Sequence, residues 1–160
     1  MQIKEMRRKD KAMTHEDALA FLKTQNEGIL ALRGSNGYPY AVPLNFAFLD
    51  DETIMFHCAP TGQKLGFIGE GCEACFTVGR QLGIFTEGKV PCTSFRTPYE
   101  SVVAFGQLSR LEGEGKIQVL TEFVRRFMKH EPPVGTFETN YMMHTGVLIF
   151  KISHLSGKRS

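Results

Sequence analysis

An alternating stretch from Tyr38 to Phe48 constrains this chain most. Its even positions are bulky and apolar, and its odd positions are small, polar or proline. This period of two predicts a β-strand with one bulky face. Pro39 and Pro43 lie on the other face and have no backbone N–H. Part of the strand is therefore predicted to lie at a sheet edge or to be interrupted by a bulge, where another hydrogen-bonding group can lie against it.

A second strand is predicted over Thr53–Cys58, after a short turn at Asp50 and Asp51. The alternation places His57 on the same face as Met55 and opposite Phe56 and Cys58. Because the two strands follow each other across a short turn, they are predicted to pair as neighbours in an antiparallel sheet.

The residues from Thr61 to Lys64 are predicted to form an anion-binding turn. Thr61 is placed to cap a short helix that begins near Gly62 and buries Leu65 and Ile68. Free amides at Gly62 and Gln63, together with the Lys64 ammonium group, would attract an anion. The alternative is an ordinary helix cap with a surface lysine, and the spacing alone does not separate these two interpretations.

The remaining pattern is β-rich with peripheral helices. Asn36-Gly37 predicts a hairpin turn with positive φ at both residues. Thr14 and Asp17 predict a capped first helix, and a helix over 114–129 is predicted to pack over the mouth of a barrel. Further strands are predicted over 29–33, 72–78, 99–111 and 146–153, with a long loop over 79–93. Six or seven antiparallel strands with helices at the periphery indicate a mainly β, α+β fold, either a closed or a split barrel.

Composition places limits on function. With 160 residues, 42% hydrophobic residues and a net charge of +2, the chain is predicted to be a single domain over residues 1–160. The near-neutral charge gives no indication of nucleic-acid binding, and no apolar run predicts a membrane span or a signal peptide. A cytoplasmic protein with reduced cysteines is expected. Cys72 and Cys75 would point to opposite faces of a strand, so no metal site is expected there.

Four motifs in chain order resemble a known family. They are Gly37–Phe46, Phe56–Leu65, Ser94–Gly106 and Leu155–Lys158. Together they resemble the FMN-binding split-barrel superfamily of pyridoxamine 5′-phosphate oxidase, and most of all its branch of nitroimidazole-resistance (Nim-type) proteins. The resemblance extends from about Met6 to Lys158. It implies a six- to seven-stranded antiparallel split β-barrel.

The resemblance also implies an FMN site. The phosphate would lie near Gln63 and Lys64, where the oxidases commonly carry Ser-Arg-Lys and this chain has Gly62-Gln63-Lys64, with one arginine fewer. The flavin ring edge would meet the backbone of Val42, Pro43, Leu44 and Asn45. His57 is the catalytic candidate, as a hydrogen-bond or proton donor; the alternative is a structural histidine. The other implied cofactor-binding residues are Phe56, Cys58, Thr61, Arg96, Tyr99 and Ser101.

Members of the family bind two flavins at a homodimer interface. Carried over to this chain, Tyr99, Glu100 and Ser101 would face the flavin held by the partner subunit, and Arg96 would add positive charge. The implied function is an FMN-dependent oxidoreductase of small aromatic or nitro compounds that uses a nicotinamide donor. A pyridoxamine-phosphate oxidase-like enzyme and a non-catalytic flavin or haem binding or sensor protein remain as alternatives.

Overall fold

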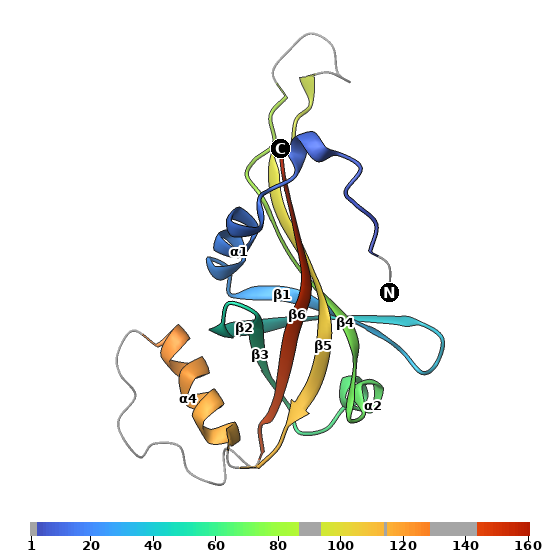
Figure 1. Cartoon of the computed structure of the whole chain (residues 1–160), viewed down its shortest axis with the longest axis vertical. Helices are drawn as coiled ribbons and strands as arrows, with labels where there is room; N and C mark the ends of the chain where they lie inside the picture. Colours follow the sequence, from blue (N-terminus) through green and yellow to red (C-terminus); the bar gives the residue numbers. More distant parts are fainter. Residues whose placement is uncertain (1–2, 87–93, 114, 129–143) are drawn as a thin grey trace.

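A computed structural model describes residues 3–86, 94–113, 115–128 and 144–160 (Figure 1). Its strands form a closed antiparallel barrel in the order β1-β2-β3-β6-β5-β4, which confirms the predicted mainly β barrel. The strands are β1 (Glu27–Arg33), β2 (Pro39–Asp50), β3 (Thr53–Cys58), β4 (Gly71–Gln81), β5 (Tyr99–Leu111) and β6 (Gly146–Arg159). The helices are the 3₁₀ turn η1 (Lys9–Lys11) and the α-helices α1 (His15–Lys23), α2 (Gln63–Ile68) and α4 (Gly115–Phe127).

Aromatic side chains fill the interior of the barrel. The Phe76 ring lies edge-on to Phe46 at 4.9 Å and to Phe56 at 5.1 Å between ring centroids. These rings and Phe150 are fully buried, and edge-to-face packing of this kind adds to the stabilisation from burial. Because close-packed rings occupy the centre, a ligand has to bind at the outside of the barrel.

The β2 strand has the predicted alternation and the predicted open edge. Val42 and Leu44 pack against the core, whereas Pro39 and Pro43 are exposed. Among the described residues, β2 pairs with β1 over Pro39–Asn45 and with β3 only over Phe46–Asp50. The half that carries the prolines is therefore paired on one side only, and a register shift follows between Phe48 and Asp50. The edge position predicted from the prolines is therefore observed, whereas the register shift lies in the other half of β2, away from Pro39 and Pro43.

The predicted N-terminal cap of helix α1 is confirmed, whereas the positive φ predicted for Asn36 in the hairpin turn is wrong. The Thr14 hydroxyl accepts a hydrogen bond from the Asp17 amide at 3.0 Å, so the helix cap is formed. At the hairpin only Gly37 has a positive φ, of 85°. The Asn36 side chain instead accepts a hydrogen bond from the Tyr38 amide at 3.1 Å. This side-chain turn stabilises the reversal without a left-handed Asn36.

Strands β4 and β6 extend furthest beyond the ranges that the alternation predicted. Strand β4 continues to Gln81, because Gly79–Gln81 pair with Tyr99–Ser101, so the loop predicted from Gly79 begins later. Strand β6 continues to Arg159, with a register shift opposite Phe105 and Gly106. The remainder of the predicted loop, residues 87–93 with Cys92, lies outside the described residues. Hydrogen bonds to the neighbouring strands stabilise both extensions. The side-chain alternation within one strand does not show which strands it pairs with.

Helix α4 lies on the outer wall of the barrel, and the prediction that it packs over the mouth is wrong. Leu120 and Phe123 pack with Ala47, Met55 and Val147, which are on the outward faces of β2, β3 and β6. The reason is that these outward faces are themselves apolar and offer the helix a surface to bury. The predicted end residues 114 and 129 lie outside the described part. None of the helices in the described part is long and apolar enough to cross a membrane.

Candidate functional site

Strands β2 and β3 separate at Phe46 and Phe56, and this fork places most of the predicted site. Beyond Phe46, β2 follows β1 from Asn45 back to Pro39. Beyond Phe56, β3 follows β6, so that His57 pairs with Val147 and Cys58 pairs with Gly146. We call this divergence the fork. The open edge of β2 lies on one side of it, and His57, Cys58 and the turn into α2 lie on the other.

Helix α2 fixes the position of Lys64 beside the fork. Leu65 and Ile68 are buried against the core, as predicted. The Phe67 ring packs edge-on against Tyr40 of β2, with 5.5 Å between ring centroids. Helix α2 is therefore anchored both to the barrel interior and to the strand that forms the other side of the fork.

The predicted threonine cap of α2 is wrong. The helix begins at Gln63 with Gly62 as its N-cap, and no side chain makes a capping hydrogen bond. Gly62 has a φ of 134°, a conformation that glycine adopts far more readily than other residues, so the backbone and not Thr61 sets the entry into the helix. Thr61 and Gln63 are exposed and Lys64 is half-buried. Apart from the cap, the predicted anion site is not contradicted: α2 begins next to Gly62, and Lys64 has no acidic partner in the described part of the chain.

The charge around Cys58 is positive. Burial raises the pKa of the Cys58 thiol. The positive charges of Lys64, Arg110 and Lys116 lower this pKa, but by less than burial raises it. Arg110 is paired with Glu112 at 3.0 Å. Lys116, like Lys64, has no ion pair within the described residues. Two uncompensated ammonium groups near one end of β3 favour an anion there.

His57 lies on the outer face of the barrel with Met55, as predicted, and under α4. Its side chain is exposed overall, but the Phe123 ring packs edge-on against the imidazole at 4.6 Å between centroids. Burial lowers the pKa of His57 below 6.5, and the positive charge of Lys64 lowers the pKa further. The imidazole is therefore neutral at pH 7, with one ring nitrogen as a donor and the other as an acceptor.

We expect Phe123→Ala to raise the pKa of His57 towards 6.5. Removing the ring lets water reach the imidazole and removes the larger of the two causes of its lowered pKa. The Hε1 resonance, followed by NMR titration from pH 4.5 to 8.5, measures this directly. Lys64→Ala should raise the same pKa by a smaller amount, and Phe127→Ala, which removes the ring beside Phe123, is the matched control. A titration unmoved by Phe123→Ala would contradict burial as the cause.

Several predicted cofactor contacts are possible through the backbone only. The Phe56 side chain is fully buried in the barrel interior, and Val42 and Leu44 also face inward. Pro43 and Asn45 are exposed on the outward face, and the Asn45 amide donates to the Asn26 carbonyl at 3.2 Å. The surface that β2 offers at the fork is therefore flat, and it consists largely of backbone with Pro43 at its centre.

Arg96, Tyr99 and Ser101 lie at the other end of the barrel. Ser101 pairs with Lys158, whereas Cys58 pairs with Gly146, twelve residues earlier on the same strand. At about 3.3 Å per residue this separates the two groups by about 40 Å. One chain therefore does not bring the predicted site residues together. The two groups can meet at one ligand only if two copies of the chain are involved.

A family model described as pyridoxamine 5′-phosphate oxidase matches residues 14–159. The chain belongs to this family. The search of curated proteins finds no match. The family consists of flavin-binding split barrels, and the fork and the α2 turn lie within the matched region.

Solved structures show the same fold at low sequence identity. A protein of Bacteroides thetaiotaomicron described as a 5-nitroimidazole antibiotic resistance protein is 18% identical, with a TM-score of 0.78 over 92% of this chain and 86% of its own. A FAD and heme binding protein of Mycobacterium smegmatis is 21% identical, with a TM-score of 0.81 over 94% and 73%. A flavocytochrome of Azotobacter vinelandii is 19% identical, with a TM-score of 0.79 over 98% and 72%.

Sequence reasoning missed three residues at the fork of this family member. Phe123 covers His57, Lys116 adds charge, and Phe67 anchors α2 to β2. Phe123 was visible only as one residue of an apolar helical stripe, because its partner lies 66 positions earlier in the chain. The patterns identify which residues are buried or charged, but not which of them meet.

Proposed function

We propose that this protein is a cytoplasmic FMN-dependent oxidoreductase that reduces small aromatic or nitro compounds with a nicotinamide donor. One observation carries the proposal. The half-buried Lys64, without an acidic partner in the described residues, lies on a helix anchored to the open, proline-bearing edge of β2. A phosphorylated planar cofactor requires this combination of a cation and a flat hydrogen-bonding ledge.

The residues at the fork fit FMN. Lys64 would bind the phosphate, with Lys116 adding charge, and the backbone from Val42 to Asn45 would hydrogen-bond the edge of the ring. When bound, the flavin supplies hydride and electron transfer. The protein positions the ring on the strand edge, compensates the negative charge with its ammonium groups, and limits access of water where α4 covers the outer wall.

His57 is proposed as the catalytic residue. The neutral imidazole can donate a hydrogen bond to an acceptor through one ring nitrogen, and its protonated form can deliver a proton and regain it from solvent. The Phe123 ring packs edge-on against the imidazole and shields part of it from water. The proximity of Lys64 opposes a positively charged imidazole, which favours donation of a proton once His57 is protonated.

A homodimer would complete the site. Because the second group of residues lies about 40 Å along β6 from the fork, the partner would supply Arg96, Tyr99 and Ser101 to the flavin held at Lys64. The printed description of the Bacteroides neighbour supports an acceptor of the nitroimidazole class. The FAD and heme binding neighbour supports the alternative of a non-catalytic flavin or haem binding protein. The alternative of a pyridoxamine-phosphate oxidase-like enzyme draws on the family description.

The absorbance spectrum of the purified protein tests the proposal. We expect a flavin spectrum that bleaches on anaerobic addition of NADH or NADPH and returns on addition of a nitroimidazole. Release of the cofactor by heat, followed by chromatography, distinguishes FMN from FAD. A stable flavin band that neither donor bleaches would favour a binding protein, a Soret band would favour haem, and oxidation of pyridoxamine phosphate would favour the oxidase.

A further inference from the structure

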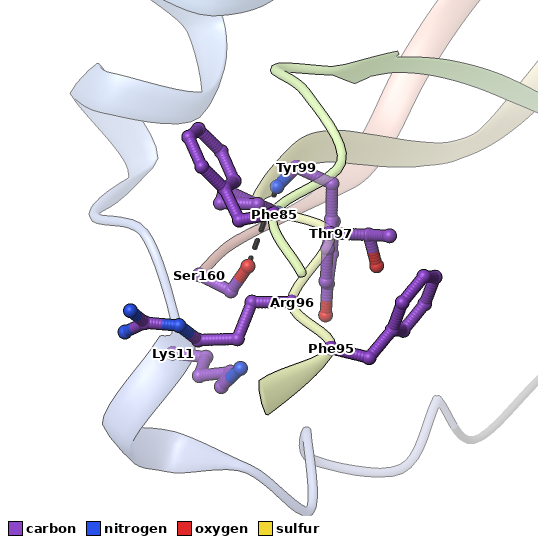
Figure 2. A pocket seen from close by; sticks show the side chains of 8 residues that line it. Lys11, Phe85, Phe95, Arg96, Thr97, Tyr99 and Ser160 are labelled. Atoms are coloured by element: carbon purple, nitrogen blue, oxygen red, sulfur yellow. Dashed lines mark hydrogen bonds between the residues drawn. The ribbon is translucent and has the colours of Figure 1, made fainter. Parts of the chain in front are cut away.

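The cavity drawn in Figure 2 lies at the end of the barrel away from the fork, with Arg96 and Tyr99 in its wall. In the proposed function these two residues serve the flavin of a partner chain, so the cavity belongs to the same site. The contact that joins helix α4 to the C-terminal end of helix α1 lies outside that cavity. Both helices lie on the same side of the barrel (Figure 1).

Helix α4 rests on the barrel through a small apolar contact. Leu120 and Phe123 are buried against the outward faces of β2, β3 and β6. Ile117 and Phe127 of the same helix, and Met128 directly after it, remain 47%, 39% and 45% exposed. Because the hydrophobic effect has no direction, this contact holds the helix against the wall but does not by itself fix where each side chain lies along it.

Arg126 supplies a bond that has a direction. Its guanidinium group donates to the carbonyl oxygen of Lys23 at 2.9 Å, across 103 positions of the sequence. Lys23 is the last residue of α1, and the carbonyls of the two residues before it accept hydrogen bonds from the amides of Thr24 and Gln25. A cation is favoured at a helix C-terminus, where the last carbonyls have no partners within the helix. Arg126 therefore completes the end of α1.

The acceptor of this bond is itself held against the barrel. Leu22, in the last turn of α1, is buried in the main core. The Lys23 side chain contacts Asp51, in the turn between β2 and β3, and lies over the Phe48 ring at 5.7 Å from its centroid. The carbonyl that Arg126 binds is therefore fixed relative to β2, one of the strands on which α4 rests.

Helical geometry connects Arg126 to the cover over His57. Phe123 precedes Arg126 by three positions, so the two side chains are neighbours on one face of α4. The Phe123 ring lies 4.6 Å from the imidazole, between centroids. Rotation of a helix by one residue swings its side chains by about 100° and would carry the ring away from His57. A fixed Arg126 opposes this rotation.

We propose that Arg126 is a positioning residue for His57. Its bond to the end of α1 sets the rotation and register of α4 on the barrel wall, and thereby keeps the Phe123 ring against the imidazole. The effect on catalysis rests on the proposed function, in which His57 delivers a proton. The effect on the position of Phe123 depends on contacts within the chain alone.

NMR titration of His57 in the full-length protein tests the position. We expect Arg126→Ala to raise the pKa of His57 towards 6.5, because a displaced Phe123 ring lets water reach the imidazole. The rise should not exceed that in Phe123→Ala. Arg126→Lys keeps a cation at the end of α1 and should restore most of the wild-type behaviour. Arg125→Gln, which removes the same charge one position away, is the matched control, because Arg125 bonds to Glu122 of α4 at 3.5 Å.

The double variant Arg126→Ala/Phe123→Ala separates positioning from the loss of a positive charge. If Arg126 acts through Phe123, Arg126→Ala has no further effect once the ring is gone, and the double variant titrates like Phe123→Ala. A further rise of equal size in the double variant, an equal rise in Arg125→Gln, or an unchanged titration in Arg126→Ala would each overturn the proposal. Circular dichroism checks that every variant is folded.

The pH dependence of turnover extends the test to catalysis. A proton donor is active below its pKa, so the rate at which a nitroimidazole reoxidises the reduced flavin should fall as pH rises through the pKa of His57. We expect Arg126→Ala to move this fall to higher pH, by the same shift that NMR gives. If only the NMR titration moves, the positioning is supported and proton donation by His57 is refuted. A protein without flavin would refute the proposed function, and the NMR titration would still test Arg126.

Discussion

Gly106→Ala is expected to destabilise the protein by at least about 3 kcal/mol, enough to lower Tm by roughly 6 to 12 °C. A Cβ atom at Gly106 would lie 2.0 Å from the carbonyl oxygen of Lys151 and 3.1 Å from the Phe150 ring. Gly106 is at the register shift between β5 and β6, where the two backbones approach closely. Relief of the contact requires β6 to move away, and this disrupts the pairing that closes the barrel.

Gly79→Ala is the matched control for this substitution. Gly79 also lies in a paired strand, but its added Cβ would meet Glu100 and Ser101 no closer than 3.8 Å, an ordinary contact. We expect its free energy of unfolding to stay within about 1 kcal/mol of the wild type. Urea denaturation followed by circular dichroism measures both variants. Equal stabilities for the two would show that the close approach at Gly106 is not a constraint.

Much of the fold could be predicted because its information is local. The alternation in β2 and β3 places each side chain inside or outside the barrel, and two prolines predict the open edge. The threonine cap of α1 was also predictable, because its donor and acceptor are three residues apart. Asn36 was predicted incorrectly because its side chain accepts a hydrogen bond from the Tyr38 amide, which forms a turn without a positive φ at Asn36.

The site was predictable in its parts and not in its assembly. Lys64 and Pro43 were identified from short motifs, but the fork that separates β2 from β3 depends on which strands pair, and pairing is non-local. Helix α4 was expected at the mouth because its own stripe does not reveal that the outward faces of β3 and β6 are apolar. Likewise, nothing local to Tyr99 indicates that Lys11 and Lys158 converge on its ring.

Lys64→Ala is expected to raise the Kd for FMN about ten- to a hundredfold while the fold is retained. The substitution removes a charge-assisted contact to phosphate worth about 1.5 to 3 kcal/mol. The half-buried Lys64 has no acidic partner in the described residues, so its removal leaves no carboxylate unpaired and should cost little stability. Quenching of flavin fluorescence on titration into apoprotein measures the Kd, and circular dichroism confirms the fold.

Two further variants separate the charge of Lys64 from other effects at the fork. Lys64→Arg keeps a cation and should retain most of the affinity, and added salt should weaken FMN binding more in the wild type than in Lys64→Ala. His57→Ala should keep FMN bound but slow the reoxidation of reduced flavin by a nitroimidazole, because it removes a proposed proton donor and leaves the phosphate contact intact. If Lys64→Ala binds FMN as tightly as the wild type, then the cation beside the open edge of β2 does not hold a phosphate, and the assignment of the fork as the flavin site is wrong.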